Sequence, residues 1–349
     1  MTMKSRTKKT LFYFFSLPAI AAVVFGALLF IYAVTPMDSA KDKSGVVDIP
    51  TGTSLIRVIN ILHNAGLVQN RVLFHALVVV KGGARSVRAG EYEFAADISP
   101  SVLVDKLLHG EIKQYRVTIF EDSSISQVAS RLREYKLINE KDFFELAQDR
   151  EFLSFLDIQS ASIEGHLFPD TYFLDRSMTT RQIMRIMVER YHSRVSPEMI
   201  RKAAQKGLNA NQFVTFASLV GKESGYAAEK PMIAAVFYNR LKKGMPLQCD
   251  PTAVYDLKNF KGKVKRFHYK RESPYNTYQI RGLPPGPIAS PGLDSFQAVL
   301  NPAGVDYLYF VSKGDGTHFF SSSLVAHNDA TIRFRNMMNR EEKTDEVVR

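Results

Sequence analysis

NQFVTFASLVGKES, residues 211–224, has the spacing of a helix that packs one side against a protein core. Phe213, Phe216 and Val220 are three and four positions apart, so they lie on one stripe of a helix. Glu223 follows three positions later and continues that stripe at the last turn. The Ser-Gly pair after it is typical of a helix end. The stretch therefore predicts a core helix with a carboxyl group at the edge of the core.

Glu223 has two interpretations. Burial and the partial negative charge at a helix C-terminus both disfavour a carboxylate, so both would raise the pKa of Glu223. A carboxyl that stays protonated near neutral pH is what a general acid requires. The alternative is a side chain that reaches solvent at a fraying end or pairs with a nearby lysine. The stripe by itself does not exclude that alternative.

Composition narrows the class of protein. The chain has 349 residues, of which 45% are hydrophobic and 11% aromatic, which is ample for a core. Its formal charge of +11 invites a nucleic-acid interpretation. The basic residues are scattered, however, with no Arg-rich helix, zinc-finger spacing or RNP-type strand. We expect no nucleic-acid partner, because an anionic polymer or a membrane surface accounts for the charge equally well.

Residues 11–34 are 24 consecutive residues without a charge, preceded by a basic segment at residues 1–10. At about 1.5 Å per residue this stretch crosses a hydrocarbon core of roughly 30 Å. A cleaved signal peptide has an apolar region of only about 7–15 residues, so an uncleaved single-pass transmembrane anchor is favoured. Because basic flanks stay in the cytoplasm, the N-terminus is expected inside and the chain from residue 35 outside. This predicts a protein of the cytoplasmic (inner) membrane whose main domain lies on the periplasmic or outer side.

The remaining chain is predicted to be α+β throughout. Residues 35–45 form a polar linker, residues 46–114 a small module, residues 115–340 a larger domain and residues 341–349 a loose tail. The module has a strand, a Pro-Thr-Gly-Thr-Ser turn, two helices and a strand, an order that resembles LysM-like modules that bind cell-wall glycans. A purely structural role fits that order equally well.

Part of the module recurs seventy residues later. The same spacing of apolar residues appears at both places, as two copies of a strand–helix–helix unit would produce. Chance similarity between two amphipathic helices is the open alternative. The positions Ile49, Leu55, Val58, Leu62 and Leu67 map onto Ile119, Ile125, Val128, Leu132 and Leu137.

The larger domain is expected to contain helices near 179–192 and 196–206 and a hairpin over 307–321. The segment 244–306, rich in Pro, Gly and Tyr, is too long for a plain loop in a compact domain. It is therefore expected to be functional or well tied down.

Polar candidates cluster after Glu223. Asn239 and Arg240, near the end of the next helix, could aim into a cleft or could simply be solvated. Gln248, Asp250 and Thr252 alternate on a predicted short extended segment, although the Asp-Pro pair also signals a turn. Asp250 is the leading candidate for a second carboxylate.

Aromatic and amide side chains follow at Tyr275, Asn276 and Tyr278. Such groups commonly grip sugar rings, and a structured loop is the alternative. We interpret His318 and His327 first as polar residues with a structural role around the site, and second as residues that assist catalysis. The eight histidines lack a metal-site spacing, and no P-loop, G-x-S-x-G or dinucleotide fingerprint is present. The lone Cys249 cannot form an internal disulfide. We therefore expect no metal and no cofactor.

Eight blocks of sequence occur in a fixed order over roughly residues 115–330. They are EGHLFPDTY, ASLVGKES, VFYNRL, LQCDPT, YNTY, GLPPGPIASPG, YLYFV and GTHFFS followed by HN. In this order they resemble the signature blocks of the MltG/YceG-like endolytic murein transglycosylases.

This resemblance implies cleavage of peptidoglycan glycan strands between N-acetylmuramic acid and N-acetylglucosamine, leaving a 1,6-anhydro end and using no metal. It implies that Glu223 is the catalytic acid, and that Gln248, Asp250, Tyr275 and Asn276 position sugars with support from Arg240. Gly221 departs from the family pattern, which commonly has a Glu there, so that only one Glu remains in the block. Peptidoglycan synthases are partners that the resemblance suggests.

Two other functions stay open at this point. One is a hydrolytic muramidase with Glu223 and Asp250 as its two carboxylates. The other is an anchored protein that binds the cell wall without catalysis, which the LysM-like module and Gly221 make plausible.

Overall fold

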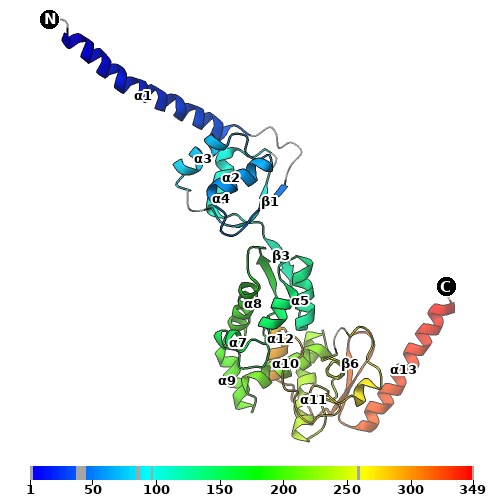
Figure 1. The fold of residues 1–349 in the computed structure, drawn as a ribbon. Coiled ribbons are helices and arrows are strands. Elements are labelled where there is room, and N and C mark those ends of the chain that lie inside the picture. Colours follow the sequence, from blue (N-terminus) through cyan, green and yellow to red (C-terminus); the bar gives the residue numbers. More distant parts are fainter. Residues whose placement is uncertain (1–2, 37–44, 84–86, 96, 258–259, 348–349) are drawn as a thin grey trace. The chain divides into compact units, whose positions relative to one another are not determined.

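The computed structural model describes residues 3–36, 45–83, 87–95, 97–257 and 260–347, which form two compact units (Figure 1). The first unit consists of residues 1–115 and 174–178, and the second of residues 116–173 and 179–349. The elements of the first unit are α1 (Met3–Val34), β1 (Gly45–Ile49), α2 (Leu55–Asn64), α3 (Arg71–Val80), β2 (Gly90–Phe94) and α4 (Pro100–His109).

The module in the first unit has the strand–helix–helix–strand order that its sequence predicts. β1 pairs with β2 in an antiparallel sheet, with Val47 opposite Tyr92. Leu62, Phe74 and Leu103, from three different helices, are fully buried in one core. The mixed α+β class is confirmed, while the LysM-like identity of the module stays a prediction.

α1 contains an 18-residue stretch, Leu17–Val34, that is long and apolar enough to cross a membrane. A signal sequence would pass the same test. The last turns of α1 also belong to the first unit, because Leu29 and Ala33 are buried in its core. The side chains of the basic segment and most of the 35–45 linker lie outside the described residues.

A short return segment, residues 174–178, completes the first unit. Within it, Arg176 Nη1 pairs with Glu91 Oε1 at 2.8 Å, and its guanidinium lies 4.4 Å from the centroid of the Tyr115 ring. The first unit is therefore closed by residues that follow the first part of the second unit, residues 116–173, along the chain.

The second unit is built mainly of helices around α10, with two small sheets. β3 pairs with β4, and β5 with β6 forms the predicted hairpin, in which Phe310 is opposite Phe320. Its elements are β3 (Tyr115–Thr118), α5 (Ile125–Glu134), α6 (Glu140–Leu146), α7 (Arg150–Phe155), β4 (Thr171–Leu174), α8 (Thr180–Arg194), α9 (Pro197–Gln205), α10 (Ala210–Glu223), α11 (Lys230–Lys242), α12 (Leu293–Leu300), β5 (Tyr309–Ser312), β6 (His318–Ser321) and α13 (Leu324–Val347), with short 3-10 turns η2 (Ala227–Glu229), η3 (Asp250–Ala253) and η4 (His268–Lys270).

The repeat at seventy residues is confirmed as a repeat of elements. β1, α2 and α3 are followed by β3, α5 and α6, and the two matching helices begin at Leu55 and Ile125. Corresponding residues such as Leu62 and Leu132 are fully buried. The predicted domain boundaries remain predictions, and α13 continues as helix into the 341–349 segment.

α10 is buried on all sides rather than along one stripe. Every residue from Phe213 to Gly221 is buried, because α9, α11 and α12 all pack against this helix. Phe213 meets Phe296 of α12 edge-on at a centroid distance of 5.2 Å. Its start is defined by a capping box, in which Asn209 and Gln212 satisfy each other's backbone N–H groups. α10 is thus the central element of the second unit.

The predicted extended segment at Gln248, Asp250 and Thr252 is wrong. Gln248 has a left-handed backbone, with φ of 53°, and residues 250–253 form the 3-10 turn η3. Pro251 favours this outcome, since its fixed φ suits the first turn of a helix. As a result Thr252 is fully buried while Asp250 is exposed, so the two do not share a face.

We expect Gly165→Ala to destabilise the second unit more than Gly207→Ala. Both glycines have φ of +82°, but a Cβ at Gly165 would lie 2.6 Å from Pro287 Cγ and 2.8 Å from Val214 Cγ1, whereas nothing lies within 4 Å at Gly207. Left-handed strain costs about 1–2 kcal/mol at either site, and overpacking adds about 1–3 kcal/mol at Gly165 alone. Thermal unfolding followed by circular dichroism would measure this, and equal losses would contradict close packing at Gly165.

Candidate active site

Glu223 is the last residue of α10, after which Ser224 continues in an extended conformation. Its side chain is half-buried overall, but Oε1 is sealed from solvent and, within the described part of the chain, has no hydrogen-bond partner. Burial raises the pKa of Glu223 to about 7; the Cys249 thiol and the Arg240 guanidinium lower it, and the Asp250 carboxylate raises it. At neutral pH a large share of Glu223 is therefore protonated, as a general acid needs.

Asp250 lies beside Glu223 and is held by two tyrosines. Tyr278 donates its hydroxyl to Asp250 Oδ1, and Tyr269 donates to Oδ2 at 3.1 Å. The two rings stack with centroids 4.3 Å apart. Burial and then the Asp250 carboxylate raise the pKa of Tyr278, so its hydroxyl stays a donor. Together they present a carboxylate and a pair of stacked aromatic rings next to the acid.

Arg240 is engaged by the protein itself. Its Nε donates to Leu308 O at 2.7 Å, and Nη1 donates to Leu247 O at 2.8 Å. Nη1 also reaches Gln248 Oε1 at 3.3 Å, and the guanidinium lies 5.4 Å from the centroid of the Tyr309 ring. Arg240 therefore ties the β5 region to the segment that leads into Asp250, and it acts on Glu223 through its charge. Gln248 itself is exposed beside Asp250.

Asn239, Thr252 and Asn276 hold the backbone around the site. Each donates its side-chain hydrogen to backbone carbonyls, and Thr252 and Asn276 are fully buried. A direct contact of these three with substrate stays a prediction, because their donors are already used. The bonds run from Asn239 to Val305 O at 2.9 Å and Tyr307 O at 3.0 Å, from Thr252 to Cys249 O at 2.5 Å, and from Asn276 to Arg271 O at 2.7 Å and His268 O at 3.2 Å.

Tyr275 and His318 make their contacts with residues other than Glu223 and Asp250. The Tyr275 ring packs on Tyr255, with centroids 4.7 Å apart, and Tyr255 donates to Glu164 at 2.9 Å. His318 Nδ1 lies 2.8 Å from Glu229 Oε2, in a pair that is mostly buried. Among the predicted residues, the structure thus brings Gln248, Asp250, Tyr278 and Arg240 to Glu223.

Glu164 is a second acid with a raised pKa, and its surroundings exclude the role given to Glu223. Burial raises the pKa of Glu164 to about 7, against hydrogen bonds from the Ile125 N–H and the Tyr255 hydroxyl. The Ile125 N–H lies 3.0 Å from Oε1, and the Tyr255 hydroxyl 2.9 Å from Oε2. Glu164 is only 2% exposed. This burial keeps Glu164 away from a substrate in solvent, and its hydrogen bond from the Ile125 N–H holds the start of α5.

Gly221 is explained by Asp122. A Cβ on Gly221 would lie 1.9 Å from Asp122 Oδ1, so the carboxyl of Asp122 occupies the place of a side chain at position 221. Asp122 has φ of 59°, and its Oδ1 is buried without a hydrogen-bond partner among the described residues. Burial raises the pKa of Asp122 to about 6, against the charges of Lys230 and Lys222. The absence of a side chain at 221 is thus required by the carboxyl that packs against α10.

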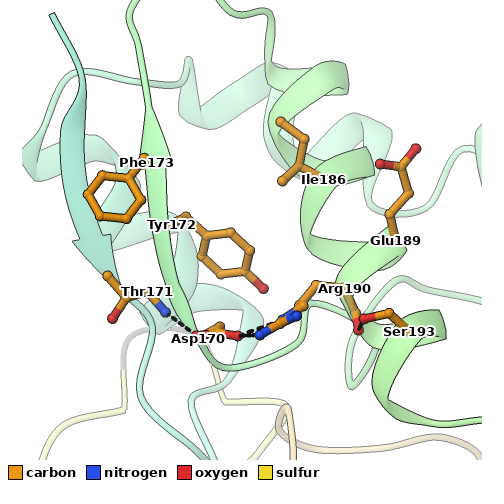
Figure 2. A pocket seen from close by; sticks show the side chains of 8 residues that line it. All are labelled: Asp170, Thr171, Tyr172, Phe173, Ile186, Glu189, Arg190 and Ser193. Carbon is orange, nitrogen blue, oxygen red and sulfur yellow. Dashed lines mark hydrogen bonds and ion pairs between the residues drawn. The ribbon is translucent and has the colours of Figure 1, made fainter.

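Two further features of the second unit can be compared with this site. The described residues contain no group of three or more His, Cys, Asp or Glu side chains that could hold a metal ion. A surface pocket lies between β4 and α8, where Arg190 Nε donates to Asp170 Oδ2 at 2.6 Å (Figure 2). Although burial opposes it, the Thr171 N–H and Arg190 hold the pKa of Asp170 below its usual range, so this carboxyl is no general acid at neutral pH.

The sequence profile of the YceG-like family matches residues 47–333. The chain belongs to the YceG-like family. This YceG-like chain is 31% identical over 320 residues to an endolytic murein transglycosylase of Bacillus subtilis, covering 87% of the chain and 88% of the relative. It is 27% identical to an endolytic murein transglycosylase of Streptococcus pneumoniae, covering 87% of the chain and 61% of the relative. A crystal structure of a YceG-like protein of Listeria monocytogenes aligns with a TM-score of 0.58 at 30% identity, covering 82% of this chain and 98% of that one.

Four residues of this region are not singled out by the sequence. Tyr269 lies in a stretch without periodicity, and only the fold brings its hydroxyl to Asp250. Cys249 offers in sequence only a thiol without an obvious partner. Glu164 stands in the EGHLFPDTY block, and that block was the one available signal for it. Asp122 carried no signal, because its effect on Gly221 comes from a contact across about a hundred residues.

We expect Gly221→Ala and Asp122→Gly to compensate each other. Alone, Gly221→Ala forces a Cβ against the Asp122 carboxyl and should cost about 1–3 kcal/mol of unfolding free energy. With Asp122→Gly present, the space is free, and alanine should be favoured over glycine in the helix by about 1 kcal/mol. A double-mutant cycle measured by chemical denaturation tests this contact. Additive effects of the two substitutions would show that Asp122 does not occupy that space.

Proposed function

We propose that this chain is a membrane-anchored endolytic murein transglycosylase with Glu223 as its catalytic acid and base. It cleaves glycan strands of peptidoglycan between N-acetylmuramic acid and N-acetylglucosamine, leaves 1,6-anhydro-N-acetylmuramic ends and needs no cofactor. The observation that carries the proposal is the carboxyl of Glu223, which is only half-buried and has a pKa of about 7. Family membership supports the class of substrate.

The reaction needs only one carboxyl group. Protonated Glu223 gives its proton to the glycosidic oxygen as the bond from C1 of the muramic sugar breaks. The resulting carboxylate then takes the proton of the 6-hydroxyl of the same sugar, whose oxygen forms the new bond to C1. One proton is given and one is taken back, so no water is consumed and Glu223 returns to its starting form.

Asp250 is given a supporting role in this mechanism. A hydrolase would use it as a second carboxylate that activates water or attacks the sugar. Here each oxygen of Asp250 accepts a tyrosine hydroxyl, which fixes the carboxylate in place. Its negative charge instead helps to keep Glu223 protonated.

The sugar-binding role falls on groups that remain accessible around Glu223. The stacked rings of Tyr269 and Tyr278 offer aromatic surface, and Gln248 offers an exposed amide. Arg240, Asn239, Thr252 and Asn276 hold the loops that carry these groups. We propose Tyr275 and His318 as further contacts with a bound glycan strand, at a greater distance from Glu223.

The anchor proposal rests on α1. A single pass with the N-terminus in the cytoplasm would hold both units on the periplasmic or outer side of the inner membrane, where glycan strands are found. The strand–helix–helix–strand module is proposed as a LysM-like unit that contacts glycan. Peptidoglycan synthases are proposed as protein partners on family grounds alone.

Digestion of purified glycan strands with the full-length chain tests the activity. Mass spectrometry should find 1,6-anhydro ends, and Glu223→Gln should lower the rate by about 10²- to 10⁴-fold because a general acid is lost. The matched control is Glu198→Gln, the same substitution at an exposed glutamate on α9, and it should keep full activity. Reducing ends without anhydro product would favour the muramidase, and no cleavage by the wild type would favour a wall-binding protein.

The pH profile gives a second test. Since Glu223 must be protonated in the free enzyme, kcat/KM should fall about tenfold per pH unit above about pH 7. Asp250→Asn removes a charge that raises the pKa of Glu223, so this decline should begin at lower pH while anhydro product is still formed. Complete loss of cleavage in Asp250→Asn, with the fold intact by circular dichroism, would instead assign Asp250 a direct chemical step.

A further inference from the structure

The last turns of α1 are part of the first unit and not a free stalk. Leu29 and Ala33 are buried in the same core as Phe74 of α3 and Leu103 of α4. The hydroxyl of Tyr32 donates to the carbonyl of Asn70, the N-cap of α3, at 3.3 Å. α1 and α3 are therefore packed together directly at the end of the apolar stretch.

This packing fixes the depth of α3 relative to a membrane that α1 would cross. About 20 residues of helix span a hydrocarbon core of roughly 30 Å. If the span begins near residue 11, it ends near residue 30; if it begins at Leu17, it ends a few residues beyond Ala33. Ala33 thus lies within about one helical turn of the lipid–water boundary in either case and Leu29 within about two, and the helix packed on them lies at a similar depth.

The exposed side of α3 carries a stripe of valines. This ten-residue helix buries Phe74, Leu77 and Val78, while Val72 is 74% exposed, Val79 47% and Val80 72%. The spacing from 72 to 79 and 80 keeps these valines within about 100° of one another around the helix, with the exposed Arg71 and His75 to one side. A soluble helix normally presents polar residues to solvent, and among the described residues of the first unit this stripe stays uncovered.

The stretch of sequence that contains α3 is basic. From Ile49 to Gly90 it has five basic residues and no Asp or Glu, although Lys81 pairs with Asp105 of α4 at 2.7 Å. Arg57 of α2 and Arg71 at the start of α3 are both exposed. Valines beside arginines are the composition of helices that lie in the interface of an anionic bilayer, where each basic residue contributes about 1 kcal/mol. The five are Arg57, Arg71, Lys81, Arg85 and Arg88.

We propose that the exposed valine stripe of α3 docks onto the anionic lipid surface beside α1. The inference rests on the proposed transmembrane role of α1. It adds that the first unit is seated in the membrane interface, with Val72 and Val80 among the lipid chains and Arg71 at the headgroups. The chain then contacts the bilayer through two elements, one that crosses it and one that lies on it.

Depth-dependent quenching tests the proposal on the full-length chain. Val72→Cys and Val80→Cys are labelled with a fluorophore and placed in nanodiscs of phosphatidylglycerol and phosphatidylethanolamine that carry doxyl groups on their acyl chains. Val46→Cys, an exposed valine on β1 of the same unit, is the matched control. The native Cys249 is buried and should not react with the fluorophore, so the wild-type chain serves as the unlabelled control. We expect quenching several-fold stronger at positions 72 and 80 than at position 46.

Two failures can be told apart. If the chain stays in the nanodisc but positions 72 and 80 are quenched no more than position 46, α3 does not contact lipid and the inference is wrong. If the chain is not retained in the nanodisc on size-exclusion chromatography, the anchor itself fails and the inference fails with it. Activity on glycan strands is independent of both outcomes.

Discussion

The burial of α10 from Phe213 to Gly221 is the constraint on which the second unit depends. A helix surrounded on every side by other elements has no face on which a polar side chain can escape to water. Any carboxyl held at its end is partly withdrawn from solvent as well, and this is the physical origin of the raised pKa of Glu223. The same crowding explains Gly221, since the Asp122 carboxyl fills the space beside that residue. The chemistry of the site and the packing of the core are consequences of one arrangement.

The long segment after α11 is held in place by hydrogen bonds from buried polar side chains to its backbone. Loops carry backbone carbonyls and N–H groups that must find partners when they are covered. Here buried polar side chains supply them: Arg240, Asn239 and Asn276 each donate to more than one carbonyl. A loop fixed in this way can present Asp250, Tyr269 and Tyr278 in a defined arrangement without belonging to a helix or a strand. Residue types that suggest a sugar site in sequence therefore divide into those that stay accessible around Glu223 and those that hold the surrounding backbone.

Much of the fold could be predicted from sequence because its signals are local. The helical spacing around Phe213, the turn at Gly314-Asp315-Gly316 and the seventy-residue repeat each depend on nearby residues. Glu223 was found as an irregularity in such a spacing, and the ordered blocks then singled it out. The alternation of polar residues from Gln248 to Thr252 wrongly predicted an extended segment. There the left-handed backbone of Gln248 and the fixed φ of Pro251 turn the chain. Tyr269 and Asp122 could not be found, because their partners lie far away in sequence and only tertiary packing brings them together.

The return segment around Arg176 has a consequence for the order in which the protein assembles. The first unit begins at the N-terminus but is completed by residues 174–178, which carry the partner of Glu91. During synthesis its helices and sheet can form early, while its last ion pair and the ring contact with Tyr115 must wait until the chain has passed residue 178. By then β3, α5 and α6 have already been made. The first unit therefore cannot complete its folding before part of the second unit has been synthesised. A chain truncated before residue 174 would lack the Arg176–Glu91 ion pair of its N-terminal unit.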